Sequence, residues 1–160
     1  MIFIGIDPGK AGAIAAIDTR NTILLLEDYP GDEYACARLV KDFMSVVATS
    51  AKAAIERAQS MPQQGVRSMF TYGDNFGVWK GVMCMAEIPY MLPTPQQWQK
   101  GVISKAKDKK PALAAAQRLF PTADLVGPRG GAKDGRADAL LIADWCRRQF
   151  VAEQPRRRRR

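Results

Sequence analysis

The chain has 160 residues, of which 47% are hydrophobic and 25% are charged; this composition suits one globular domain with its own core and excludes a disordered chain. No apolar run approaches the ~20 residues that a membrane-spanning helix requires, and the short apolar N-terminus lacks the basic flank of a signal peptide, so we expect a cytoplasmic protein with no membrane partner. The formal net charge is +8, but Arg156–Arg160 supply five of the positive charges, and the remaining 19 basic and 16 acidic residues leave the rest at +3.

The first part of the chain reads as three strands, a helix and another strand. Alternating apolar residues predict strands over 2–6, 12–17 and 22–27, joined by short turns into an antiparallel meander. Apolar residues at helical spacing predict an amphipathic helix over 33–48. A short apolar run predicts a buried strand over 52–56.

The segment 64–87 carries two stripes at helical spacing and is predicted to be a helix. One stripe is large and apolar and consists of Met69, Tyr72, Phe76, Trp79 and Met83. The neighbouring stripe consists of Gly73, Gly77 and Gly81. Because each interior glycine costs ~1 kcal/mol relative to alanine, we expect another part of the backbone, most simply the sheet, to approach this face closely. The aromatic stripe would then remain exposed and available as a dimer interface.

The remaining elements are a short strand and three helices. We expect the strand within 89–93, a helix from the start signal Thr94-Pro95 to residue 100, and helices over 111–120 and 134–150. Lysines crowd the segment 100–110, and glycines at 127–133 predict a mobile loop. Antiparallel and parallel strands with helices between them predict an α/β domain with a mixed central sheet flanked by helices.

We expect the domain to comprise residues 1–150, followed by a basic, disordered tail over 151–160. Such a run of like charge is an arm for nucleic acid or an appended tag. The three cysteines, Cys36, Cys84 and Cys146, lack metal-ligand spacing and are expected to be buried free thiols. The sequence contains no histidine, which excludes Ser-His-Asp and Cys-His catalysis and every histidine-containing zinc site.

Two acidic residues end predicted strands. Asp7 follows the first strand and Glu56 ends the strand that begins at Lys52. If these strands are parallel neighbours, both carboxylates emerge at their carboxyl ends, where open α/β sheets place their sites. Each residue also has a simpler interpretation, because Asp7 precedes a Pro-Gly turn and Glu56 precedes Arg57 in a possible ion pair.

Two further acids, Asp134 and Asp138, lie one helical turn apart, so both face the same side, which we expect to be the core. Buried like charges need a neutralising partner. Carboxylate oxygens suit Mg²⁺, with Mn²⁺ able to substitute, and four acids can hold two ions ~4 Å apart for hydrolysis of a phosphodiester without histidine. Separately, Asp134 could cap the helix and Asp138 could pair with Arg136 or with the region of Arg147. The other aspartates are interpreted as turn or surface acids: Asp18, Asp28, Asp32, Asp42, Asp74, Asp124 and Asp144.

Three motifs occur in a recognisable order. They are Ile4-Gly5-Ile6-Asp7-Pro8-Gly9, Ile55-Glu56, and the run Asp134-Gly135-Arg136-Ala137-Asp138-Ala139-Leu140-Leu141-Ile142-Ala143. Together they span nearly the whole chain and resemble the RuvC family of Holliday junction resolvases. The spacing of four between the last two acids departs from the spacing of three typical of bacterial RuvC and is similar to the phage and chloroplast branch.

The resemblance implies a ribonuclease H-like fold, a homodimer, and Mg²⁺-dependent paired nicking of four-way or branched DNA by a bacterial or phage-encoded enzyme without a nucleotide cofactor. By motif, Asp7, Glu56, Asp134 and Asp138 would be the metal-binding and catalytic acids. Lys110, or Lys109 beside it, would be the basic catalytic residue near the scissile phosphate. The aromatic stripe could stack on opened junction bases instead of forming the dimer.

Three alternatives compete with this interpretation. An actin-like ATPase shares the first motif but needs two lobes and a second phosphate loop, so this chain is too short. A non-catalytic DNA-binding module would account for the lysines, but acids near phosphate would hinder it. A ribonuclease H-like nuclease acting on flaps, forks or hybrids differs from a resolvase mainly in surface shape, and sequence barely separates the two.

Overall fold

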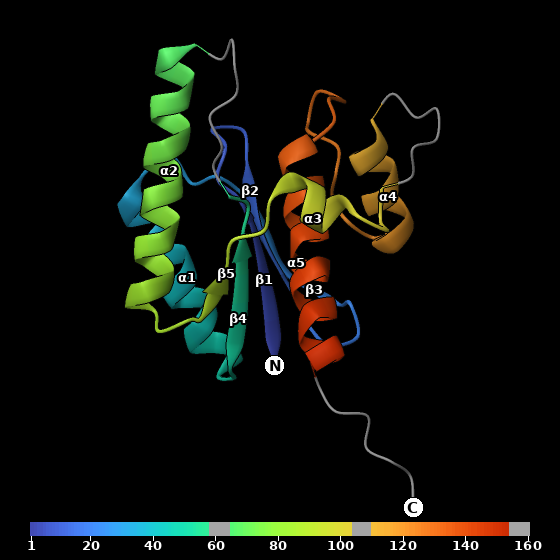
Figure 1. The fold of residues 1–160 in the computed structure, drawn as a ribbon, viewed down its shortest axis with the longest axis horizontal. Helices are drawn as coiled ribbons and strands as arrows, with labels where there is room; N and C mark the ends of the chain where they lie inside the picture. Colours follow the sequence, from blue (N-terminus) through green and yellow to red (C-terminus); the bar gives the residue numbers. More distant parts are fainter. Residues whose placement is uncertain (58–64, 104–109, 154–160) are drawn as a thin grey trace, which may run out of the picture.

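The computed structural model describes residues 1–57, 65–103 and 110–153. Five strands form one mixed sheet in the order β3-β2-β1-β4-β5, with helices on both of its faces (Figure 1). The first three strands form the expected antiparallel meander: β1 (Ile2–Asp7), β2 (Ala13–Ile17) and β3 (Ile23–Asp28). The strands β4 (Ala51–Ile55) and β5 (Tyr90–Met91) continue the sheet in parallel with β1.

The helices divide between the two faces of the sheet. One face is covered by α1 (Glu33–Val47) and α2 (Val66–Met85), and the other by α3 (Pro95–Gln99), α4 (Pro111–Leu119) and α5 (Asp134–Glu153) (Figure 1). The mixed α/β architecture predicted from the sequence is therefore confirmed. The first three residues of the expected tail, 151–153, belong to α5, and residues 154–160, which include the arginine run, lie outside the described residues.

Alternation along β1 builds two cores. Ile2, Ile4 and Ile6 face α1 and α2, while Phe3 faces α5. Gly5 shares the face of Phe3, and a Cβ added there would overlap the backbone of α5 at Ala139 and Ala143. Because Gly5 has no side chain, α5 can pack directly on β1. This packing places the first turns of α5, which contain Asp134 and Asp138, near the end of β1.

The orientation expected for α2 is wrong. Its large apolar stripe faces the sheet, with Trp79 and Met83 fully buried, while a Cβ added at Gly73, Gly77 or Gly81 would meet nothing within 4 Å. Burying the large side chains removes far more apolar area from water than burying glycines would. The glycine face, and not the aromatic stripe, is consequently the exposed one.

Other details also differ from expectation. Cys84 is exposed, whereas Cys36 and Cys146 are buried as expected. Asp144 is not a surface acid: its side chain is 4% exposed and is bound by Arg147 and Arg148 on the same helix. The glycine-containing loop expected over 127–133 is present and includes a tight turn, in which the Gly127 amide donates to the Gly131 carbonyl; its mobility stays a prediction. In the part of the chain that the structure describes, no helix is long and apolar enough to cross a membrane.

Candidate functional site

The first two acids are brought together by the register of β1 and β4. Ile6 pairs with Ile55, and the amide of Glu56 donates a 2.9 Å hydrogen bond to the Ile6 carbonyl. Asp7 and Glu56 therefore leave adjacent parallel strands at the same edge of the sheet. The turn role considered for Asp7 is also present, since its Oδ1 accepts a 3.0 Å hydrogen bond from the Gly9 amide. The other oxygen of Asp7 remains free of this turn bond.

Two aromatic side chains bind both carboxylate oxygens of Glu56. The Tyr72 hydroxyl donates to Oε1 at 3.0 Å, and the Trp98 indole donates to Oε2 at 2.7 Å. Burial, with the nearby charge of Glu56, raises the pKa of Tyr72, so this phenol keeps its proton and acts as a donor. The ion pair considered between Glu56 and Arg57 is not among the ion pairs of the described residues.

The acids of α5 do not share one environment. Asp138 is largely buried and faces the other acids, whose charges act on it. Asp134, the first residue of α5, keeps 59% of its side chain exposed and pairs with Lys110 at 2.7 Å. The expectation that both acids point into the core is thus wrong for Asp134, which lies at the exposed start of α5 and pairs with the half-exposed ammonium of Lys110. The structure places Lys110 beside this fourth acid.

The electrostatics of the three inner acids are unfavourable in the absence of a cation. Burial raises the pKa of Asp7, opposed by the Gly9 amide. Burial also raises the pKa of Glu56, with the Asp7 charge adding to it and the two aromatic donors opposing it. The pKa of Asp138 is raised to about 8, by burial and then by the charges of Asp7, Glu56 and Asp134. Among the described residues, no lysine or arginine forms an ion pair with any of these three carboxylates.

The donor set fits a hard divalent cation in its chemistry. All the ligating atoms would be carboxylate oxygens, which Mg²⁺ and Mn²⁺ prefer, and a cation would replace mutual repulsion with attraction. Within residues 1–57, 65–103 and 110–153, no three metal-ligating side chains already stand close enough to form a complete cation-binding group. Binding would therefore have to draw the carboxylates of Asp7, Glu56 and Asp138 together.

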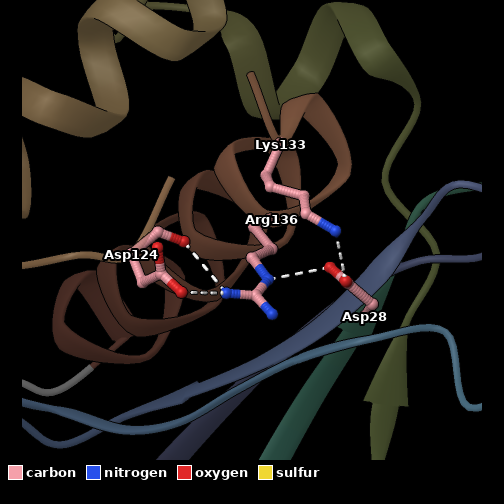
Figure 2. A network of polar contacts seen from close by, with 4 residues as sticks. All are labelled: Asp28, Asp124, Lys133 and Arg136. Atoms are coloured by element: carbon pink, nitrogen blue, oxygen red, sulfur yellow. Dashed lines mark hydrogen bonds and ion pairs between the residues drawn. The ribbon is translucent and has the colours of Figure 1, made fainter. Parts of the chain in front are cut away.

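A polar network fixes the start of α5 (Figure 2). Arg136 donates to Asp28 at 2.8 Å and to the Asp124 carboxylate at 2.7 Å, and Lys133 donates to Asp28 at 2.6 Å. Gly135 lies against the β1–β2 turn, where a Cβ would overlap the backbone at Ala11. These contacts attach the first turn of α5 to the end of β3 and to the turn that follows Asp7.

The sequence carries no clear signal for these supporting residues. Helical spacing allows Arg136 to pair with Asp138, but the guanidinium instead binds Asp28 and Asp124, two acids that the sequence places in turns or on the surface. Trp98 lies outside every predicted motif, although its indole reaches across 42 positions to Glu56. Local sequence patterns do not predict a contact between residues this far apart in the chain. The available signal is the presence of a tryptophan, Trp98, in a short helix.

Comparisons with known proteins agree with this architecture. No protein-family model matches the chain, and no curated protein matches it. The structure of Thermus thermophilus RuvC in complex with a Holliday junction substrate is similar, with a TM-score of 0.67 at 17% sequence identity over 95% of this chain and 94% of that chain. A second Thermus thermophilus RuvC structure gives a TM-score of 0.64 at 16% identity over 95% of both chains. The chain therefore has a RuvC-like, ribonuclease H-like fold, as predicted.

Proposed function

We propose that this protein is a structure-selective endonuclease that resolves four-way DNA junctions by paired, metal-dependent nicks, acting as a homodimer. One observation carries the proposal: three largely buried carboxylates, Asp7, Glu56 and Asp138, converge at one edge of the sheet with no cationic side chain paired to them in the described chain. The likeness to a RuvC bound to a Holliday junction supports the choice of substrate. The spacing of four between Asp134 and Asp138 favours the phage and chloroplast branch of such enzymes.

The chain's own residues have separate tasks in this reaction. Asp7, Glu56 and Asp138 would hold Mg²⁺ or Mn²⁺, with Asp134 joining from the rim of the site. Bound ions of this kind activate a water molecule and stabilise the leaving oxygen of a phosphodiester. Lys110 would exchange its contact with Asp134 for a phosphate oxygen, because an exposed ion pair is worth at most ~1 kcal/mol and a backbone phosphate competes for the ammonium.

The outer face of α2 is the surface that we assign to the homodimer. Gly73, Gly77 and Gly81 leave this face open to close approach by another helix, and Phe70 and Met85 on the same helix are 77% and 86% exposed. A groove of about 790 Å³ between α1 and α2 continues this apolar area and is lined by Met44 and Val82 among others. Exposed apolar surface of this extent is typical of a contact with another protein.

The dimer is tested by Gly77→Glu, which adds a charge to the centre of the open face. Gln117→Glu on α4 is the matched control, since Gln117 is also exposed on a helix. Analytical ultracentrifugation should give a dimer for the unmodified chain and for the control, and a monomer for Gly77→Glu. If Gly77→Glu is still a dimer, the outer face of α2 is not the dimer interface.

The function is tested by cleavage of a synthetic four-way junction, with linear duplex, flap and RNA–DNA hybrid as comparison substrates. We expect symmetric paired nicks at the junction with Mg²⁺ or Mn²⁺ and none with EDTA. Asp7→Asn and Asp138→Asn should abolish cleavage while junction binding stays equal or becomes stronger, because each change removes a ligand and a negative charge together. The matched control is Asp42→Asn, an exposed aspartate on α1, which should cut normally.

The outcomes separate the alternatives. If flaps or hybrids are cut as well as junctions, the proposal of a nuclease stands. The proposed substrate would then be branched nucleic acid in general and not four-way junctions alone. Tight junction binding without cleavage under any metal condition would favour a non-catalytic binding module. Cleavage by Asp7→Asn at the rate of the unmodified chain would refute the metal assignment.

A further inference from the structure

Glu56 differs from the other inner acids in the way its carboxylate is held. Both of its oxygens accept a hydrogen bond from an aromatic side chain, Tyr72 on α2 and Trp98 on α3. The two helices lie on opposite faces of the sheet (Figure 1), so the donors approach the end of β4 from both sides. Two donors from different directions restrict the rotation of the glutamate side chain, which otherwise has three rotatable bonds.

The donor on α3 is itself firmly placed. Trp98 is 1% exposed. Its helix begins with a capping box, in which the Gln97 side chain accepts a 2.8 Å hydrogen bond from the Thr94 amide. The preceding segment is tied to the residue after Glu56, because the Arg57 amide donates to the Pro93 carbonyl at 2.8 Å. The indole N–H is therefore held at a fixed position relative to the end of β4.

A second buried tryptophan allows a comparison with the hydrogen bond between Trp98 and Glu56, because a buried indole in this fold does not always have a polar partner. Trp79 is also fully buried, yet its indole nitrogen has no hydrogen-bond partner among the described residues. The fold therefore accommodates one buried indole without a polar partner, and it directs the other at a candidate metal ligand.

We propose that Tyr72 and Trp98 are positioning residues that hold the Glu56 carboxylate in one orientation for a divalent cation. This inference rests on the proposed function. Hydrogen bonds from outside the ligand set orient metal-binding carboxylates, and their loss typically weakens metal affinity 10- to 100-fold. Each oxygen of Glu56 accepts one bond in the structure and keeps lone-pair capacity for a cation. The orientation of Glu56 is thus set before the ion arrives, so the movement that brings the three carboxylates together would fall mainly on Asp7 and Asp138.

The test measures Mn²⁺ binding to the full chain without DNA, by the electron paramagnetic resonance signal of free Mn²⁺. Trp98→Phe and Tyr72→Phe each remove one donor and keep a ring, and each should weaken Mn²⁺ binding about 10- to 100-fold. Trp79→Phe is the matched control, because it makes the same change at a buried indole without a partner; its Mn²⁺ affinity should stay within about twofold. Glu56→Gln provides the reference for loss of the ligand itself.

Cleavage kinetics supply a second measurement. The Mg²⁺ concentration for half-maximal cleavage should rise in Trp98→Phe and Tyr72→Phe, while the rate at saturating metal stays close to that of the unmodified chain. A purely structural role would instead lower the urea midpoint in EDTA without changing the Mn²⁺ affinity of the folded protein. If Trp98→Phe does not fold, the half-buried Tyr72 decides the question through its own variant.

The inference and the proposed function fail in different ways. If Glu56→Gln weakens Mn²⁺ binding but neither aromatic variant does, the positioning role is overturned and the metal site stands. If the unmodified chain does not bind Mn²⁺, or Glu56→Gln binds it equally well, the metal site itself is overturned, and the positioning role falls with it.

Discussion

Replacing Asp138 with asparagine should stabilise the metal-free protein, and the gain should depend on pH. The carboxyl is largely buried and its pKa is raised from 3.8 to about 8 in the folded state. Between these values the folded protein binds a proton that the unfolded chain releases, so stability is greatest below the unfolded pKa and falls as the pH rises through the folded pKa. Asparagine keeps the size of the side chain and removes the charge.

The magnitude follows from the two pKa values. Each pH unit in the interval between 3.8 and about 8 is worth ~1.4 kcal/mol, which gives a ceiling of about 4 kcal/mol for the loss between pH 5 and pH 8.5. Partial relaxation of the site lowers the expected pH-dependent gain of Asp138→Asn to about 2–4 kcal/mol. The cost of accommodating the amide is nearly independent of pH, so it cancels when the two pH values are compared.

The assay is urea unfolding followed by tryptophan fluorescence in EDTA at both pH values. The unmodified chain should lose stability relative to Asp138→Asn between pH 5 and pH 8.5, and Mg²⁺ should restore part of it only in the unmodified chain. Asp42→Asn controls for removal of an exposed carboxylate. A difference between Asp138→Asn and the unmodified chain that is equal at both pH values would refute the reasoning.

Two further variants test the packing that positions the acids. Arg136→Gln should cost about 1–3 kcal/mol in urea unfolding because it breaks charged hydrogen bonds to Asp28 and Asp124. Lys133 and Arg136 lower the pKa of Asp28 against the effect of burial, so the loss should be complete above the unfolded pKa of 3.8 and should shrink as the pH falls from there through the lower folded pKa. A pH-independent loss would argue against this network. Gly5→Ala should cost about 3 kcal/mol or more because its Cβ meets the backbone of α5, whereas Gly73→Ala in dilute protein should gain ~1 kcal/mol; equal effects would contradict the described packing.

The sequence predicts most of the fold because its strands and helices have clear hydrophobic periods. The closeness of two candidate acids could be predicted for a related reason: Asp7 and Glu56 follow two strands whose parallel pairing brings their ends together. The supporting contacts could not be found in this way. Trp98 lies 42 residues from Glu56, and Arg136 lies 108 residues from Asp28, so both contacts depend on the packed tertiary structure.

The inverted orientation of α2 has a different cause. Glycines at a spacing of four predict close packing of their face, but the large side chains beside them have more apolar area to bury. A glycine offers almost no apolar area to bury, whereas a buried large side chain contributes ~1.5–3 kcal/mol, so Trp79 and Met83 decide which face meets the sheet. Glycines at this spacing indicate only that another backbone can approach that face of the helix. Whether that backbone belongs to the same chain depends on the neighbouring stripe, because large apolar side chains there take the place against the sheet.

Two largely buried aspartates on α5, Asp144 and Asp138, differ in how their charges are neutralised. Asp144 is a buried carboxylate, and the chain neutralises it with Arg147 at 2.8 Å and Arg148 at 2.9 Å. Asp138, six positions earlier on the same helix, is largely buried beside two other acids and has no such partner among the described residues. The chain thus supplies arginines where a buried charge serves structure. No such ion pair is present at Asp138 among the described residues, and conflicts of this kind between local energetics and an otherwise consistent fold are typical of functional sites. A divalent cation held by Asp7, Glu56 and Asp138, as proposed above, would relieve this conflict.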